Sequence, residues 1–180
     1  MTGLDVRYVG SVDGERVAYK VDMVGTDVEA AQLIVNPSIN GLATELDVAK
    51  DIQNGMLPKD FPSRADFELL ATMTPAKEVG GDFYDFYFLD ETHLAITVAD
   101  VSGKGIPAAL FMVISKTILN NFAVSMHNSA GLSEVVAAAN DKLCANNDAM
   151  MFVTAFIGVL DLETGEFTFV NAGHNPPVIY

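Results

Sequence analysis

Two stretches decide the fold: Val79-Gly80-Gly81-Asp82-Phe83-Tyr84-Asp85 and Ala99-Asp100-Val101-Ser102-Gly103-Lys104-Gly105. Between them a single β-hairpin is predicted. Residues 83–89 and 93–101 are rich in aromatic and β-branched side chains, and residues 90–92 (Asp-Glu-Thr) have the composition of a three-residue turn. Both faces of the two strands carry apolar side chains, which is typical of strands buried inside a layered structure. The hairpin is therefore expected to be central, with a glycine-rich stretch at its open end on each strand.

The length of the turn sets which residues face each other. With a three-residue loop, Leu89 faces His93 and Asp82 lies opposite Asp100. A four-residue loop, which the alternation of side chains does not exclude, would place Phe83 opposite Asp100. Opposed residues have Cβ atoms about 4.5–5.5 Å apart, and like charges there are destabilising. Two facing carboxylates need a shared proton or a bound cation, so we interpret Asp82 and Asp100 as a site for a hard divalent metal.

Composition limits the classes of function. The chain has 180 residues, half of them hydrophobic, which is enough for about one domain plus an extension. Its formal net charge of −14 argues against nucleic acid and against an anionic membrane surface as partners. Cys144 is the only cysteine, which excludes a disulfide framework and indicates a reducing, cytoplasmic setting. We expect no signal peptide and no stretch long and apolar enough to span a bilayer.

The order of the predicted elements indicates an α+β layered domain rather than a doubly wound parallel sheet. Antiparallel pairs joined by short turns enclose two consecutive helices. Besides the central hairpin, the expected elements are a strand at 67–73, helices at 108–126 and 133–144, and a closing hairpin at 151–161 and 166–171.

The N-terminal part is predicted to be separate from this domain. Residues 4–23 indicate a β-hairpin turned at Asp13-Gly14, and because two strands alone are marginal, it packs on something or is the tail of a preceding domain. We expect residues 1–37 to be this extension or the tail of an upstream sensor domain, residues 38–58 a linker or regulatory helix, and residues 59–180 the main domain.

The linker helix is expected to start at Asn36-Pro37-Ser38 and to end at Leu57-Pro58. Its apolar residues recur at three- and four-residue spacing, interrupted by Gln53. This pattern fits a coiled-coil seam in a dimer, and it fits a single surface helix equally. The apolar positions are Ile39, Leu42, Leu46, Ala49 and Met56.

The stretch from Val101 to Gly105 is not a P-loop, because Val98 stands where that motif needs glycine and Gly105 where it needs Ser or Thr. It predicts a glycine turn between a strand and a helix. The amides of such a helix N-terminus favour anions, so Gly103 and Lys104 are candidate phosphate ligands. Lys77 is a further candidate, with a solvated surface lysine as its alternative.

Other polar residues near these motifs have less specific interpretations. By alternation Asp85 points away from Asp82, which favours a structural or supporting role. His174, in the run from Ala172 to Pro177, is predicted to be a turn residue whose ring hydrogen-bonds backbone, with a role as ligand or base as the alternative. His93 and His127 have no carboxylate or cysteine grouped around them in the sequence, so we rank them below His174.

Four motifs then follow one another along the chain, at 51–58 (DIQNGMLP), 78–85 (EVGGDFYD), 99–110 (ADVSGKGIPAAL) and 171–177 (NAGHNPP). In this order they closely resemble the bacterial SpoIIE/RsbU-like branch of the PPM-type protein serine/threonine phosphatases. The resemblance covers about residues 39–180. It implies an αββα sandwich with two Mn²⁺ or Mg²⁺ ions between its sheets. There a metal-bound water attacks phosphoserine or phosphothreonine, without a phosphoenzyme.

Position by position, the resemblance assigns roles to residues of this chain. Asp82 and Asp100 resemble the metal-ligand aspartates, with Asp100 bridging, and the backbone carbonyl of Val101 resembles a further ligand. Catalysis would then pass through these aspartates and their metal-bound water. The helix through Met56 resembles the regulatory linker by which an upstream sensor domain controls such phosphatases, often as a homodimer. Their substrates are commonly phosphorylated regulatory proteins, the anti-sigma-factor antagonists.

One departure from the family pattern concerns the C-terminus. The family continues past the run at 171–177 with further strands and a Thr-Asp-Gly segment whose aspartate completes the metal site, whereas this sequence stops at Tyr180. We therefore expect a sandwich incomplete at its C-terminus, with an exposed sheet edge. The functional alternatives are a phosphatase, a catalytically incomplete regulatory or dimerising module of the same fold, and a simple divalent-ion binding domain.

Overall fold

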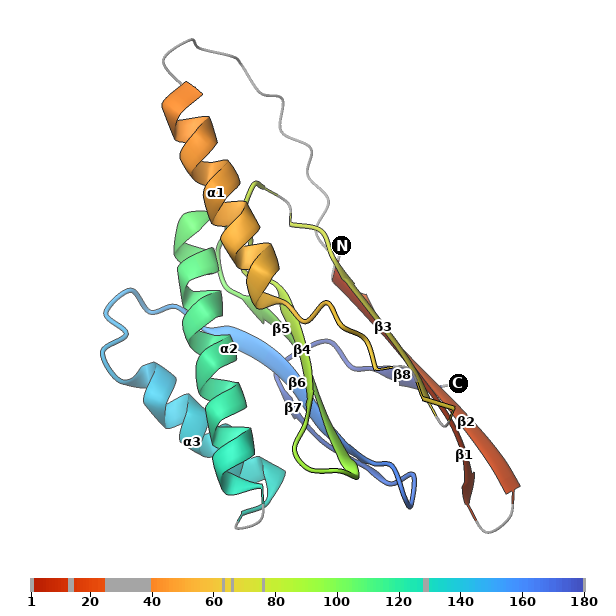
Figure 1. Cartoon of the computed structure of the whole chain (residues 1–180). Coiled ribbons are helices and arrows are strands. Elements are labelled where there is room, and N and C mark those ends of the chain that lie inside the picture. The colour runs from red at the N-terminus through yellow and green to blue at the C-terminus, as the bar shows by residue number, and fades with distance from the viewer. Residues whose placement is uncertain are drawn as a thin grey trace.

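The computed structural model describes residues 2–12, 15–24, 40–62, 64–65, 67–75, 77–127 and 130–179, with side chains from residue 45 to residue 178 within these ranges. They form three helices and two four-stranded antiparallel sheets (Figure 1). The elements are β1 (Thr2–Val12), β2 (Glu15–Val24), α1 (Asn40–Met56), β3 (Phe67–Met73), β4 (Phe83–Phe88), β5 (His93–Val101), α2 (Ile106–Met126), α3 (Leu132–Cys144), β6 (Val153–Asp161), β7 (Phe167–Ala172) and β8 (Val178–Ile179).

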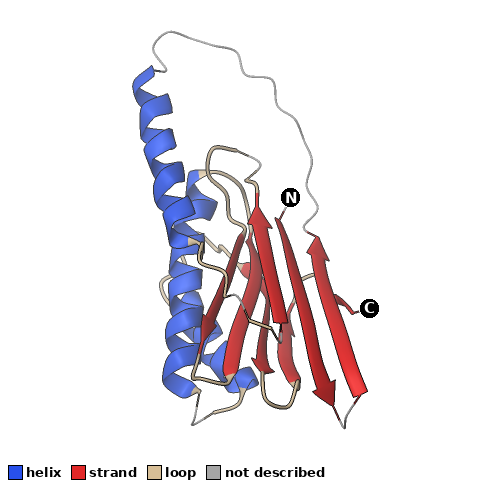
Figure 2. Cartoon of the chain, turned by 45° about the vertical axis from the view of Figure 1, so that its right-hand side comes forward, coloured by secondary structure: helices blue, strands red, loops and turns tan. Residues whose placement is uncertain are grey.

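The layers are a set of helices and two stacked sheets. The first sheet has the strand order β3-β1-β2-β8, and the second sheet has the order β4-β5-β6-β7. Helices α2 and α3 cover one face of the second sheet, and the first sheet lies on the opposite side (Figures 1 and 2). The predicted α+β layered architecture of antiparallel sheets is confirmed.

The core lies between α2 and the second sheet, and between the two sheets. The side chains of Phe83, Leu94 and Phe156 on the second sheet are at most 1% exposed, and so is Met112 on α2. Helix α2 places a buried residue on the sheet at every three or four positions, as an amphipathic helix on a core does. These residues are Ala108, Met112, Ser115, Leu119 and Ala123.

The register of the β4–β5 hairpin confirms the prediction from a three-residue loop. Phe83 pairs with Ala99 at one end of the ladder, and at the other end the Leu89 N–H donates to the His93 carbonyl at 2.8 Å. Asp82 and Asp100 are the next residues beyond the Phe83 pair, so the strands bring them opposite each other at the open end.

The N-terminal hairpin is part of the first sheet. Its two predicted strands are β1 and β2, of which β1 pairs with β3 and β2 pairs with β8. The hairpin therefore packs on the same unit that carries the central motifs. The predicted turn at Asp13-Gly14 and the predicted helix start at Asn36-Pro37-Ser38 lie outside the described residues.

Helix α2 corrects one expectation from the sequence. It has 21 residues and is long and apolar enough to cross a membrane by length and composition, so the expectation that no stretch would be is wrong. In this fold, however, α2 packs against β4, β5, α1 and α3. This packing buries one stripe of the helix, while Leu110, Ile114 and Val124 on its other side remain about half exposed or more.

Candidate functional site

Four side chains from successive segments of the chain meet at one end of the second sheet. Asp82 directly precedes β4, and Asp100 is the second-last residue of β5. Thr154 in β6 pairs with Asp100, and its hydroxyl lies 3.0 Å from Nδ1 of the His174 ring, just beyond β7. The antiparallel register, and not sequence proximity, brings these residues to one edge.

The two aspartates lie at the boundary between core and solvent. Their neighbours Phe83 and Ala99 are buried, whereas Asp82 is partly exposed and Asp100 is exposed. Carboxylates opposed across an antiparallel pair repel each other, and a hard cation with oxygen ligands removes this repulsion. The donor atoms at this edge therefore fit Mg²⁺ or Mn²⁺.

Gly81 brings the loop before Asp82 against the end of β5. A Cβ atom on Gly81 would lie 2.9 Å from the carbonyl oxygen of Val101 and 3.2 Å from Cβ of Ala108. Only a residue without a side chain allows the backbone to approach this closely. The structure thereby places the Val101 carbonyl, the predicted third donor, directly beside the loop that carries Asp82.

The predicted phosphate ligands gather at the start of α2. Gly103 and Gly105 have φ values of 85° and 72°, in the left-handed region that favours glycine, and α2 begins at Ile106. Cδ of Lys77 lies 3.8 Å from the position that a Cβ on Gly105 would occupy. Lys77 and the exposed Lys104 thus flank the same glycine turn, where free helix N–H groups attract anions.

Ser102 fastens this turn to the segment before β6. Its N–H donates to the Phe152 carbonyl at 2.8 Å, and its Oγ accepts from the Phe152 N–H at 3.0 Å. These contacts extend the β5–β6 pairing beyond Val101 and so hold the glycine turn against the second sheet.

His174 is fixed by contacts that differ from the predicted ones. Its N–H donates to Oδ1 of Asn171 at 2.8 Å, and the Asn171 amide donates back to the His174 carbonyl at 3.0 Å. The ring contacts the hydroxyl of Thr154 and not backbone, so that part of the prediction is wrong. Burial lowers the pKa of His174, and the negative charge of Asp82 opposes this shift, which places the ring in the field of the carboxylate edge.

Gln53 connects α1 to the loop that carries Asp82. Its Nε2 donates to the Gly80 carbonyl at 2.6 Å, and its Oε1 accepts from the Gly80 N–H at 3.0 Å. The Gln53 side chain is only 4% exposed. In the sequence Gln53 interrupts the apolar stripe of the helix, and an inward-facing polar residue indicates a hydrogen-bonding partner.

Asp85 lies on the helix-covered side of the second sheet. Its carboxylate is buried and forms an ion pair with Nζ of Lys116 on α2 at 2.7 Å. Burial raises the pKa of Asp85, and the neighbouring Lys116 opposes this shift. The pair fastens β4 to α2.

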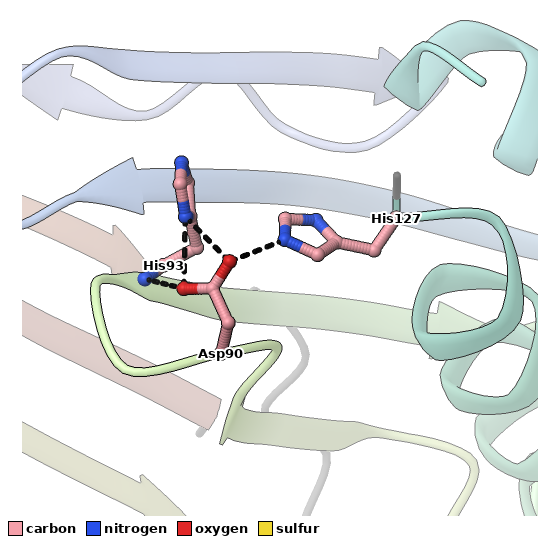
Figure 3. A group of neighbouring side chains, drawn as sticks. All are labelled: Asp90, His93 and His127. Carbon is pink, nitrogen blue, oxygen red and sulfur yellow. Dashed lines mark hydrogen bonds and ion pairs between the residues drawn. The ribbon is translucent and has the colours of Figure 1, made fainter. Parts of the chain in front are cut away.

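A second polar cluster, which the sequence did not predict, lies at the turn of the β4–β5 hairpin. Asp90 contacts both His93 and His127, so the expectation that these histidines have no carboxylate around them is wrong (Figure 3). The part of this cluster that the sequence could have indicated is the pair Asp90 and His93, three residues apart across a turn. His127 comes from the end of α2 and could not be placed from local spacing.

Comparison with known proteins identifies relatives of the whole region that carries these motifs. The family model for stage II sporulation protein E (SpoIIE) matches residues 90–180, half of the chain. Protein IcfG of Synechocystis sp. is 31% identical in an alignment of 169 positions that covers 81% of this chain and 26% of IcfG. Phosphoserine phosphatase RsbU of Bacillus subtilis is 33% identical over 141 residues, which make up 77% of this chain and 40% of RsbU. The chain thus spans less than half of the length of these relatives.

A solved structure supports the fold independently. The SiaA-PP2C domain of Pseudomonas aeruginosa has a TM-score of 0.57 and 15% sequence identity, covering 80% of this chain and 66% of that domain. At this identity the likeness concerns the fold, which is that of a PP2C domain. Together with the family match over residues 90–180, it establishes that the chain belongs to the SpoIIE/RsbU-like branch of the PPM-type protein phosphatases.

Proposed function

We propose that this chain carries the catalytic part of a metal-dependent phosphatase that acts on phosphoserine or phosphothreonine of a regulatory protein. The observation that carries the proposal is the hairpin register, which sets Asp82 opposite Asp100 beside the Val101 carbonyl. The names of two relatives, the phosphoserine phosphatases RsbU and RsbP of Bacillus subtilis, support this reaction class. An anti-sigma-factor antagonist is the proposed substrate.

The residues at this edge would have two different roles in such a reaction, binding of metal ions and orientation of the phosphate. Asp82, Asp100 and the Val101 carbonyl would hold two Mn²⁺ or Mg²⁺ ions, which supply activation of water and neutralisation of phosphoryl charge when bound. The N–H groups at the start of α2 and the ammonium groups of Lys77 and Lys104 would orient the phosphate. Their role is positional and electrostatic, since no nucleophilic side chain is needed.

The proposal also covers the domain organisation of the protein around this site. An upstream sensor domain would act through the linker helix at 38–58, with residues 1–37 as its tail or an extension and residues 59–180 as the phosphatase domain. Gln53 supports this route because it joins α1 to Gly80. We further propose a homodimer and a cytoplasmic location, with no insertion into a membrane and no nucleic acid as partner.

The test is Mn²⁺-dependent hydrolysis of a phosphoserine protein by the full-length protein and its Asp100→Asn variant. We expect the variant to lose about 100-fold or more of kcat/KM, the scale of removing a strong transition-state contact. Asp141→Asn, at an exposed position on α3, is the matched control and should retain full activity. Equal activity of the Asp100→Asn variant and the parent would overturn the assignment.

A second candidate function is a non-catalytic dimerising module of the same fold. It is favoured by Val48 and Ile52 on α1, whose side chains are 53% and 61% exposed and lie one turn apart. The 180-residue chain itself separates the two functions. Mn²⁺-dependent turnover of p-nitrophenyl phosphate that is lost in its Asp100→Asn variant would exclude the module, whereas a dimer without turnover would favour it.

A further inference from the structure

A group of three potential metal ligands lies at the opposite end of the β4–β5 hairpin from Asp82 and Asp100. Asp90 belongs to the turn of the hairpin, His93 is the first residue of β5, and His127 directly follows α2. One ligand atom from each residue lies within 4.8 Å of the other two. Figure 3 shows the carboxylate between the two rings, with His127 reaching it from the end of the helix.

The carboxylate of Asp90 is oriented by the turn itself. Its Oδ1 accepts hydrogen bonds from the backbone N–H groups of Thr92 and His93, both at 2.8 Å. Nδ1 of His93 lies 2.9 Å from both Oδ1 and Oδ2, and Nε2 of His127 lies 2.7 Å from Oδ2, so Oδ2 is the oxygen that both rings reach. The ligand atom is thus positioned by the fold before any ion arrives, which lowers the cost of ordering the site.

The rings are also arranged as ligands to one centre. The His93 and His127 rings have centroids 5.1 Å apart and are inclined by 62°, so they do not stack on each other. Each ring directs a different nitrogen at the same oxygen, Nδ1 for His93 and Nε2 for His127. Side-chain exposure is 39% for Asp90, 34% for His93 and 14% for His127, so an ion can enter from solvent.

We propose that Asp90, His93 and His127 form a second metal site, for a zinc-class divalent ion, separate from the carboxylate edge. Two imidazole nitrogens and one carboxylate oxygen are a borderline-soft set that suits Zn²⁺ and its transition-metal neighbours, whereas Mg²⁺ prefers oxygen ligands alone. Three protein ligands leave a fourth position for water or another donor.

The cluster can adopt this geometry with small movements. Zn–N and Zn–O bonds of about 2.0–2.2 Å at tetrahedral angles separate neighbouring ligand atoms by about 3.3–3.5 Å. The present contacts of 2.7 and 2.9 Å would therefore lengthen by roughly half an ångström as the ion replaces the hydrogen bonds. The negative charge of Asp161, opposite His93 on β6, adds to the attraction for a cation.

An occupied site would join the hairpin turn to the end of α2. The ion would fasten the second sheet to the helix that covers it, at the end remote from the phosphatase chemistry. Its role would accordingly be structural, and its loading should raise thermal stability without dependence on Asp82 or Asp100.

The test uses Co²⁺ as a spectroscopic probe, followed by Zn²⁺, on the 180-residue chain with Cys144→Ser. This background removes the exposed free thiol as a competing ligand. We expect one equivalent of Co²⁺ to give the visible absorption bands of a four-coordinate site, and Zn²⁺ to abolish these bands. His127→Gln keeps a hydrogen-bond donor toward Asp90 but lacks the imidazole, and it should weaken Co²⁺ binding at least about 10-fold.

Two control variants separate this site from the others. His174→Ala removes the remaining histidine of the chain, and Asp82→Asn with Asp100→Asn removes the carboxylate edge; both should keep the Co²⁺ bands and the Zn²⁺-dependent increase in Tm. The proposal is overturned if the parent gives no such bands, or if His127→Gln retains them at full affinity. Loss of the bands in the Asp82 and Asp100 variant alone would assign the ion to the carboxylate edge and also overturn it.

Discussion

At the scale of single residues, Gly81 shows how tightly the candidate site is built. The loop before Asp82 passes so close to Val101 that a methyl group has no room, because the carbonyl oxygen and Cβ of Val101 would each lie 2.9 Å away. The neighbour in the way is a backbone carbonyl and the start of a helix, neither of which can rotate aside. The position of the Asp82 carboxylate thus depends on the absence of a side chain one residue earlier.

Gly81→Ala should destabilise the fold by about 1–3 kcal/mol, as overpacking of a close-packed site does. In the full-length protein it should also weaken Mn²⁺ activation, because the loop must move away from Val101. Chemical denaturation and Mn²⁺ titration of activity measure the two effects. The control is Gly55→Ala on α1, where a Cβ would meet nothing within 4 Å and should be neutral or stabilising.

A second residue-scale prediction concerns the buried ion pair of Asp85 and Lys116. Lys116→Met should cost about 3 kcal/mol of unfolding free energy near neutral pH, because the Asp85 charge is left buried without its partner. Double substitution with Asp85→Asn should restore part of this loss. Urea denaturation of the four variants of this cycle gives the interaction energy, and a fully additive cycle would contradict the pairing.

The same pair has a defined pH dependence. The pKa of Asp85 is raised in the folded state, so the folded chain binds a proton more tightly than the unfolded chain does. The contribution of Asp85 to stability therefore falls as pH rises from the unfolded pKa through the folded one. Lys116→Met raises the folded pKa further, so its destabilising effect should diminish on acidification, when Asp85 becomes neutral.

At the scale of elements, the side chain of Gln53 joins α1 to the loop that carries Asp82. Gln53 satisfies both the N–H and the carbonyl of Gly80, and these residues are 27 positions apart in the sequence. A displacement of α1 along its axis would break both hydrogen bonds and free the loop that carries Asp82. The helix and the loop are therefore mechanically coupled, as the proposed regulation through the linker requires.

Gln53→Ala should leave the buried polar groups of Gly80 without these partners, at a cost of about 1–3 kcal/mol. Amide hydrogen exchange in residues 78–82 should become faster, while exchange in α2 should change little. Asn54→Ala, the neighbouring substitution on α1, is the control and should leave the loop amides unaffected. Unchanged exchange at Gly80 in the Gln53→Ala variant would contradict the coupling.

Whether a contact could be predicted from the sequence depends on how far apart its two residues lie along the chain. The register of β4 and β5 could be predicted because a short turn fixes it locally, and with it the opposition of Asp82 and Asp100. Contacts between distant segments could not be predicted in this way. His127 meets Asp90 over 37 positions of sequence, and only the packing of α2 on the second sheet brings the two together.

The hydrogen bonds of Gln53 to Gly80 could not be predicted from the sequence for a related reason. Apolar spacing identifies which face of a helix is buried, but it does not identify a polar partner from another segment. For His174, the sequence predicts the turn but not the contact of the ring with Thr154. That contact depends on the pairing of β6 and β7.

At the scale of the whole molecule, both sheets are needed to define the domain. The second sheet carries the carboxylate edge and the helices, and the first sheet covers its other face with strands from widely separated parts of the chain. The N-terminal hairpin stands in the middle of this arrangement, because β1 lies between β3 and β2. The proposed boundary between an N-terminal extension and a phosphatase domain therefore runs through the first sheet, whose strands come from both sides of it.

The pairing of β2 with β8 has a consequence for how the protein is made. Val21 and Asp22 pair with Ile179 and Val178, so residues near the two ends of this sequence share one ladder. During synthesis β2 leaves the ribosome long before β8, so the β2 edge of the first sheet stays unpaired until residues 178–179 have emerged. Until then this unpaired edge is a binding site for a chaperone or for the same strand of a neighbouring nascent chain.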